Sequence, residues 1–309
     1  MGPIPDHRTI HSSRRKWLAG ASAWMAGQFS GHAAPAPSKG LVFAVRKAGR
    51  LIYVGGGLHR LDRGQLPMPW PYEMAFRASV AVYFEVDPRE QSSRSAERRF
   101  AQAGTLPSGT RLQDMVPPAT WKLLTMHCDS RGFDVEDFQN DSPWLASQRL
   151  VEEEYTRLGI ESRFGMESYF GYRAKLARKR VRGLDTAEQV IDAVCGGGME
   201  AHLASFAETL RSLPSLQGDY TKLISAWRTG DEPALLKVMR PSGTSDPDWQ
   251  RMVAARNARW LPGILRTLGA AREPVFILTG LDHVPGPGGL IEGLRAAGCH
   301  ASQLTGSQS

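Results

Sequence analysis

The chain has 309 residues, which corresponds to about two average domains or one large domain. Hydrophobic residues make up 41% and charged residues 22%, and this balance excludes a disordered, collagen-like or low-complexity protein. The formal charge is +7 at pH 7, of which residues 1–36 supply +3, so the +4 left for the rest of the chain is only mildly basic.

The N-terminal segment has the order of features found in a bacterial export signal. Arg14 and Arg15 form a twin-arginine pair, residues 17–29 are weakly apolar, and the small residues of 30–36 follow. The apolar stretch is shorter than the ~20 residues that a spanning helix needs. We therefore expect residues 1–33 to be a signal peptide that is removed, and the mature protein to be periplasmic or secreted, with no stable membrane span.

Short runs of β-branched and aromatic residues predict strands near both ends of the remaining chain. Residues 41–46 and 51–54 flank a turn at 47–50 and indicate a hairpin. The apolar runs 80–86 and 275–279 are typical of buried strands.

Most of the chain between these strands has helical patterns. The spacing of Thr186 and Gln189 is that of a capping box, which predicts the start of a helix. Asp246-Pro247 indicates the start of a long helix that runs to about Leu268. Residues 88–140 are polar, and we expect them to be irregular apart from one helix. The predicted helices are 72–78, 119–126, 144–158, 167–180, 199–213 and 289–297.

These elements predict an α/β protein. Because isolated hairpins and single strands are only marginally stable, the N- and C-terminal strands would share one sheet. We expect a central, mostly parallel or mixed sheet, with a large helical middle section packed on or beside it. A single domain would span residues 41–304, between a linker at 34–40 and a tail at 305–309.

The densest basic run in the body of the chain contains no aromatic residue. A platform that stacks nucleic-acid bases needs interleaved aromatic residues, whereas cations at the end of a helix complement the helix dipole. We therefore interpret the run as a solvated helix end and expect no nucleic-acid partner. Its members are Lys175, Arg178, Lys179, Arg180 and Arg182.

Two apolar strands each run directly into a Gly-x-x-His motif, at Gly56–His59 and at Gly280–His283. The sequence has no nucleophile elbow, His-Glu-x-x-His, phosphate-binding loop or Cys-x-x-Cys pair. Glycine lets the backbone turn sharply, and neutral imidazole is a common metal ligand. Two imidazoles with one carboxylate leave positions on a divalent metal open for water and substrate.

Glu85 is the carboxylate that could complete such a site. It follows the apolar run Val80 to Phe84, where an acid without a partner would be costly. Two interpretations remain open: Glu85 joins both histidines around a metal, or it pairs with an arginine while the histidines only form hydrogen bonds. Arg256, in the predicted long helix, is either a surface residue or a partner for a carboxylate or an oxyanion.

Several motifs in this order resemble the TraB/GumN family, which is related to the Tiki metalloproteases. The resemblance covers most of residues 41–304. The motifs are Gly56-Gly57-Leu58-His59, Phe84-Glu85-Val86-Asp87-Pro88, Gly165-Met166-Glu167-Ser168-Tyr169-Phe170, Arg182-Gly183-Leu184-Asp185-Thr186-Ala187-Glu188-Gln189, Ala226-Trp227-Arg228-Thr229-Gly230-Asp231, Arg256-Asn257 and Gly280-Leu281-Asp282-His283 with Gly286 and Gly288-Gly289.

This resemblance implies an α/β fold of the erythromycin-esterase and ChaN type. It also implies a divalent metal held by the two Gly-x-x-His motifs and a Glu for peptide hydrolysis. The chain departs from the family pattern at Glu167, where Asp is usual, and at Asp185, where Glu is usual.

We therefore expect an exported metal-dependent hydrolase, of the peptidase class, that acts on a peptide or a small molecule. His59 and His283 would hold the metal, with Mn, Co and Zn not distinguished. Glu85 would serve as a ligand or as the base toward water. The supporting residues would be Asp185 and Arg256 for catalysis, and Gly56, Gly280 and Asn257 for substrate binding.

Two other hypotheses use the same residues. In the first, the protein is a non-catalytic envelope protein that binds haem or another metal complex in the same cleft. In the second, the motif residues only stabilise the loops that carry them. The ligand types for catalysis and for binding are the same, so the sequence alone does not rank the hydrolase against the binding protein.

Overall fold

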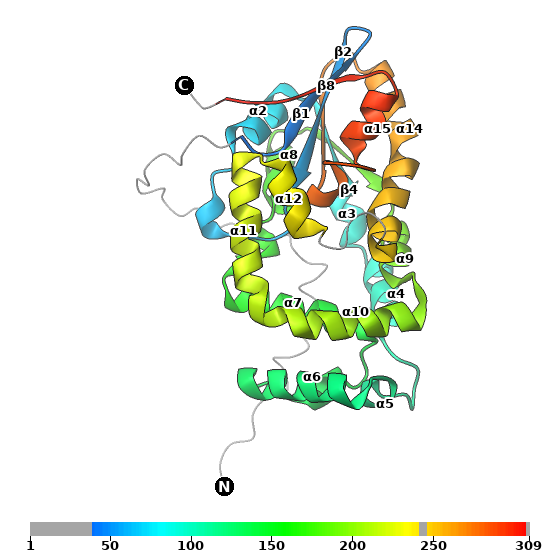
Figure 1. The fold of residues 1–309 in the computed structure, drawn as a ribbon. Helices are drawn as coiled ribbons and strands as arrows, with labels where there is room; N and C mark the ends of the chain where they lie inside the picture. The colour runs from blue at the N-terminus through cyan, green and yellow to red at the C-terminus, as the bar shows by residue number, and fades with distance from the viewer. Residues whose placement is uncertain (1–38, 241–245, 307–309) are drawn as a thin grey trace.

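A six-stranded mixed sheet lies at the centre of the protein (Figure 1). The structure, a computed structural model, describes residues 39–240 and 246–306. The predicted signal peptide and most of the predicted linker lie outside the described residues, and so does the end of the predicted tail. None of the helices in the described ranges is both long and apolar enough to cross a bilayer.

The strand order across the sheet is β6-β4-β7-β2-β1-β8. The first four run parallel, whereas β1 is antiparallel to both of its neighbours. A separate two-stranded ladder joins β3 to β5. The strands are β1 (Val42–Lys47), β2 (Arg50–Gly57), β3 (Leu61–Asp62), β4 (Ala81–Val86), β5 (Ile160–Glu161), β6 (Arg180–Asp185), β7 (Val275–Gly280) and β8 (His300–Gln303).

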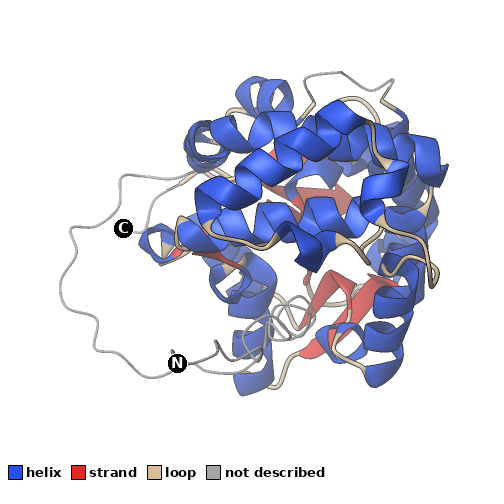
Figure 2. Ribbon diagram, turned by 90° about the horizontal axis from the view of Figure 1, so that it is seen from below, coloured by secondary structure: helices blue, strands red, loops and turns tan. Residues whose placement is uncertain are grey.

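Helices cover both faces of this sheet (Figures 1 and 2). Figure 1 shows α14 and α15 on one side, and α2, α8 and α11 on the other. The helices are α2 (Trp70–Ala78), α3 (Pro88–Gln91), α4 (Arg94–Gly104), α5 (Leu112–Met115), α6 (Pro118–Arg131), α7 (Pro143–Arg157), α8 (Met166–Leu176), α9 (Ala187–Cys195), α10 (Gly198–Ser212), α11 (Leu216–Thr229), α12 (Glu232–Met239), α13 (Pro247–Trp249), α14 (Ala255–Ala270) and α15 (Leu290–Ala296).

The α/β class and the mixed central sheet are therefore confirmed. The predicted hairpin is β1–β2, in which Lys47 pairs with Arg50 across a turn. Ala48 and Gly49 both have positive φ in this turn, as a two-residue hairpin turn requires. The capping box at Thr186 and Gln189 is also present and begins α9.

The sheet takes one strand that we did not predict. We expected a helix over 167–180, but α8 ends at Leu176 and β6 begins at Arg180. Arg178 between them has φ of 51°, a left-handed conformation that ends the helix. The strand was missed because it is the sheet edge and is only partly buried, so its sequence lacks a continuous apolar run.

Residues 88–140 are mostly helical, so the expectation of an irregular segment was wrong. The polar residues that suggested loops are partly helix caps: Asp87 accepts from the Arg89 N–H, and Ser93 accepts from the Ala96 N–H. α6, α7 and α10 then form a layer with a core of its own around Leu124, Leu150 and Phe206. Figure 1 shows this layer beyond the end of the sheet at which the parallel strands finish.

Candidate active site

The motif residues meet at the carboxyl ends of the parallel strands. β2 leads into His59, β4 carries Glu85, and β7 leads into His283 through the short helix η7 (Leu281–His283). Because β4, β7 and β2 are neighbours in the sheet, these strand ends lie side by side. Ligands of open α/β sheets bind at this edge.

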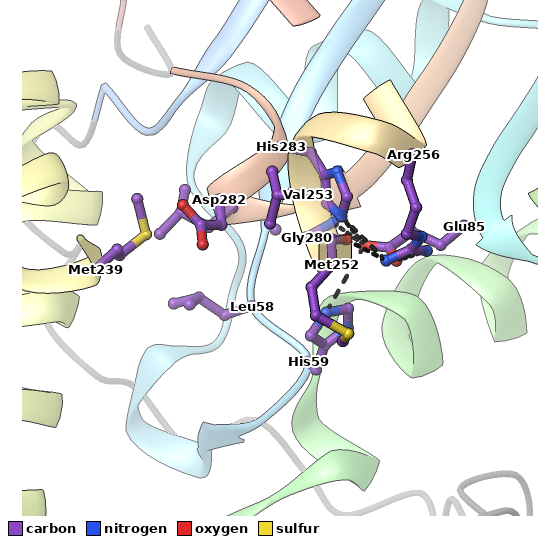
Figure 3. A pocket seen from close by; sticks show the side chains of 12 residues that line it. Leu58, His59, Glu85, Met239, Met252, Val253, Arg256, Gly280, Asp282 and His283 are labelled. Carbon is purple, nitrogen blue, oxygen red and sulfur yellow. Dashed lines mark hydrogen bonds and ion pairs between the residues drawn. The ribbon is translucent and has the colours of Figure 1, made fainter. Parts of the chain in front are cut away.

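Glu85 is at the centre of the cluster (Figure 3). Its Oε1 atom accepts from the Gly280 N–H at 2.5 Å and lies 3.8 Å from His59 Nε2 and 3.6 Å from His283 Nε2. Its Oε2 atom accepts from Arg256 Nη2 at 2.5 Å. The two interpretations left open by the sequence are thus both partly met, since Glu85 faces the histidines and also pairs with an arginine.

Each histidine is held through its Nδ1 atom. His59 Nδ1 lies 2.9 Å from Glu167 Oε1, and His283 Nδ1 lies 2.8 Å from Asn257 Oδ1. Asn257 Oδ1 is an acceptor, so His283 Nδ1 carries the proton and this neutral ring keeps its Nε2 lone pair for another contact. His59 forms an ion pair with Glu167, which favours the protonated imidazole. The two Nε2 atoms both face Glu85.

Arg256 connects Glu85 to a second buried carboxylate, that of Asp185. Arg256 Nε donates to Asp185 Oδ2 at 2.8 Å. Asp185 Oδ1 also accepts from Arg259 Nη2 at 2.6 Å and from Trp260 Nε1 at 2.7 Å. Asp185 therefore fixes the guanidinium that fixes Glu85, and it does so from the end of β6, next to β4.

The ring of Trp260 also packs against the His283 imidazole, with the ring centroids 4.5 Å apart. Neither Trp260 nor Arg259 was predicted as a site residue from the sequence. Both lie within four residues of Arg256 on α14, so helical spacing from Arg256 was the signal that could have found them.

The charges in the cluster follow from these contacts. Burial lowers the pKa of His283 to about 4, so this ring is neutral near pH 7. The Glu167 carboxylate raises the pKa of His59 to about 9, so this ring, whose side chain is 58% exposed, is protonated near pH 7. Burial alone would raise the pKa of Glu85, but the adjacent His283 ring, the Arg256 guanidinium and the protonated His59 together hold it well below its usual range. Glu85 is therefore ionised at neutral pH.

Two glycines allow the close approach of these groups. A Cβ atom at Gly280 would lie 2.8 Å from Glu85 Oε1 and 2.9 Å from His59 Nε2. A Cβ atom at Gly165 would lie only 2.0 Å from the carbonyl oxygen of His59. Gly165 precedes α8, which places Glu167 against the imidazole, so the carboxylate at position 167 reaches His59 from a different part of the chain.

The predicted substrate-binding residues have different surroundings. Gly280 lines the cavity beside the cluster. Gly56 is buried in β2, where an added Cβ would meet Leu281 and Leu41. Asn257 is buried, and its Nδ2 atom donates to the His283 carbonyl at 3.1 Å, so it holds the histidine loop.

A cavity of about 330 Å³ opens beside the cluster. Figure 3 shows its polar side, formed by His59, Glu85, Arg256 and His283. The residues that give the cavity an apolar wall are Leu58, Met239, Met252 and Val253. A volume near the lower end of the range for ligand pockets, roughly 300–1,000 Å³, suits a small group such as one side chain.

The donor set fits a divalent cation in chemistry and in approximate spacing. Two atoms that share an ion at about 2.0–2.2 Å lie at most about 4.4 Å apart, and both Nε2 to Glu85 Oε1 separations, 3.8 and 3.6 Å, are shorter. Among the described residues, however, no group of three or more His, Cys, Asp or Glu side chains is already arranged as a metal site. Arg256 Nη1 lies 3.2 Å from His283 Nε2, so an ion there would displace this contact.

These features define an α/β protein with a two-histidine, one-carboxylate cleft at the carboxyl ends of its parallel strands. The family model of the TraB/PrgY/gumN family matches residues 41–303. The chain therefore belongs to the TraB/PrgY/gumN family, as its motifs predict. No curated protein and no solved structure matches it. The expected likeness to the erythromycin-esterase and ChaN fold stays a prediction.

Proposed function

We propose that the cleft is a metal-dependent hydrolytic site that acts on peptides. The observation that supports this most strongly is the pairing of the histidines: both Nε2 atoms face Glu85 Oε1, while a separate acceptor holds each Nδ1 atom. Histidines that bind metals are usually held in this way through their second nitrogen.

In this proposal His59, His283 and Glu85 hold one divalent cation, which would supply Lewis-acid polarisation of the scissile carbonyl. Glu85 acts as a ligand rather than as the base, because Arg256 binds its Oε2 atom and only Oε1 faces the histidines. Asp185 keeps the Arg256 guanidinium in place beside the cavity. That guanidinium is positioned to stabilise negative charge on a substrate oxygen.

The cavity also supports a preference among substrates. Its apolar wall would accept an aliphatic or thioether side chain next to the scissile bond. Its volume of about 330 Å³ favours this over a macrocycle such as haem. We further propose that the protein works outside the cytoplasm, on the basis of the twin-arginine pattern.

The test is cleavage of a mixed peptide library by protein supplied in turn with manganese, cobalt and zinc. We expect cleavage with at least one metal, and a loss of 10²-fold or more in Glu85→Gln, on the order of what one catalytic group contributes. Glu208→Gln is the matched control, since Glu208 is 69% exposed and pairs with Arg211 alone among the residues that the structure describes. Metal uptake without any cleavage would contradict the proposal and favour the non-catalytic binding protein.

A further inference from the structure

The edge of the sheet opposite the cleft carries a concentration of positive charge. Arg180 and Val275 both pair with Ala81, so β6, β4 and β7 start at the same edge. The turn between Lys47 and Arg50 lies at this edge as well, because β2 is parallel to β7. Figure 1 shows this turn at the end of the sheet away from α7 and α10.

We call the exposed cations of these segments the basic edge. The segments 46–50, 77–80, 174–182 and 271–274 contain Glu273 as their single carboxylate. The members of the basic edge are Arg46, Lys47, Arg50, Arg77, Lys175, Arg178, Arg180, Arg182 and Arg272.

Helix ends account for only part of this charge. Lys47 donates to the Ala297 carbonyl and Arg50 to the Ala271 carbonyl, at the ends of α15 and α14. Arg77 lies 3.9 Å from the buried carboxylate of Glu73. The other six side chains make no hydrogen bond or ion pair with any residue in the described ranges: Arg46, Lys175, Arg178, Arg180, Arg182 and Arg272.

The four segments hold ten Lys and Arg residues against Glu273, a formal +9, whereas the whole chain after residue 36 has a formal +4. The rest of the chain after residue 36 is therefore net acidic, and positive charge is concentrated at this edge. Like charges brought together without partners raise the free energy of the folded state, and a partner of opposite charge relieves this cost. The basic edge is thus a surface suited to an anionic partner.

We propose that the basic edge docks on an anionic membrane surface. Leu176 is 66% exposed and stands between Lys175 and Arg178, an arrangement in which an apolar side chain can enter the lipid boundary while cations contact headgroups. The surface extends across most of a six-stranded sheet, or roughly 20 Å at about 4.8 Å per strand, so it is broad enough to lie on a lipid surface. A hollow of about 460 Å³ lies beside Lys47 and Arg50.

A nucleic acid is the less suitable partner. An exposed leucine gives no favourable contact with phosphates, and no exposed aromatic residue lies within the basic run 175–182 to stack on bases. Docking by this edge would leave the cavity open to solvent, because the parallel strands run from the basic edge to the cleft. The inference does not depend on the chemistry of the cleft.

The test is sedimentation of the full chain with vesicles of phosphatidylcholine that contain about 30% phosphatidylglycerol, at about 0.05 M salt. Arg8, Arg14, Arg15 and Lys16 are replaced by Gln in every protein, so that residues 1–38 add no cations. The edge variant also carries Lys175→Gln, Arg178→Gln, Arg180→Gln and Arg182→Gln. We expect it to bind about 100-fold or more weakly than its parent.

The matched control removes four exposed cations from other parts of the surface, with Arg94→Gln, Arg98→Gln, Lys122→Gln and Lys237→Gln. We expect this control to bind like the parent, and we expect parent binding to fall at about 0.5 M salt. Equal weakening in the two quadruple variants would overturn the proposal, and so would equal binding to vesicles of phosphatidylcholine alone. Tighter binding to a DNA duplex than to anionic vesicles, lost in the edge variant, would assign the basic edge to nucleic acid instead.

Discussion

Replacing Arg256 with alanine is expected to destabilise the protein by about 3–5 kcal/mol, as for other buried ion pairs that lose one partner. Arg256 is 3% exposed and donates to both Glu85 and Asp185. Without the guanidinium, the Gly280 N–H is the one hydrogen-bond donor left to Glu85 among the described residues, and the buried carboxylate loses its closest positive charge. Urea denaturation of Arg256→Ala and wild type would measure the difference.

Two further variants test whether this loss comes from the buried charge. Arg259→Ala is the control, because Arg259 also contacts Asp185 but is 43% exposed, and we expect it to cost at most about 1 kcal/mol. Adding Glu85→Gln to Arg256→Ala should recover part of the stability, since the amide is uncharged. An Arg256→Ala protein within about 1 kcal/mol of wild type would contradict the network described here.

Gly280→Ala is expected to disrupt the cluster without removing any of its polar groups. The new methyl group would lie closer than 3.0 Å to Glu85 Oε1 and His59 Nε2, so at least one of these side chains must move. We expect a stability loss of about 1–3 kcal/mol, as for other overpacked sites. If the cleft holds a metal, its affinity should fall by about tenfold or more, because the ligands are displaced.

Gly218→Ala is the control for this change. Gly218 lies in α11, where a Cβ atom would meet nothing within 4 Å. Alanine there is expected to be neutral or to stabilise the helix by up to about 1 kcal/mol. If the two alanine variants behaved equally in denaturation and metal titration, this result would contradict the close approach of Glu85 and His59 to Gly280.

Sequence patterns were sufficient for the parts of the fold that are either fully buried or strongly capped. The apolar runs predicted β4 and β7, and the Thr186 capping box predicted α9. β6 could not be recognised in the same way, because arginines alternate along this partly buried edge strand. α3 begins at the Asp87 cap and is too short for periodicity to reveal it. α4 buries Ala96, Phe100 and Gly104 at helical spacing, but its other residues are so polar that the segment was interpreted as a loop.

The sequence predicted those site residues that directly follow an apolar strand. His59, Glu85 and His283 each follow an apolar strand, and parallel strands bring such positions to one edge. The contact between Glu167 and His59 depends on where α8 begins relative to β2, which only the tertiary packing fixes. The sequence therefore drew attention to the acidic residue at position 167, but it could not predict that this residue contacts His59.

The most direct measurement of the central claim is the metal content of the purified protein, prepared without a metal-binding tag, by elemental analysis. It should be compared with a His59→Ala, His283→Ala double variant that is shown to be folded by circular dichroism. The account predicts about one divalent ion per chain in the wild type and none in the variant. A wild-type protein that takes up no ion after incubation with manganese, cobalt and zinc, or a variant that retains the ion, would contradict it.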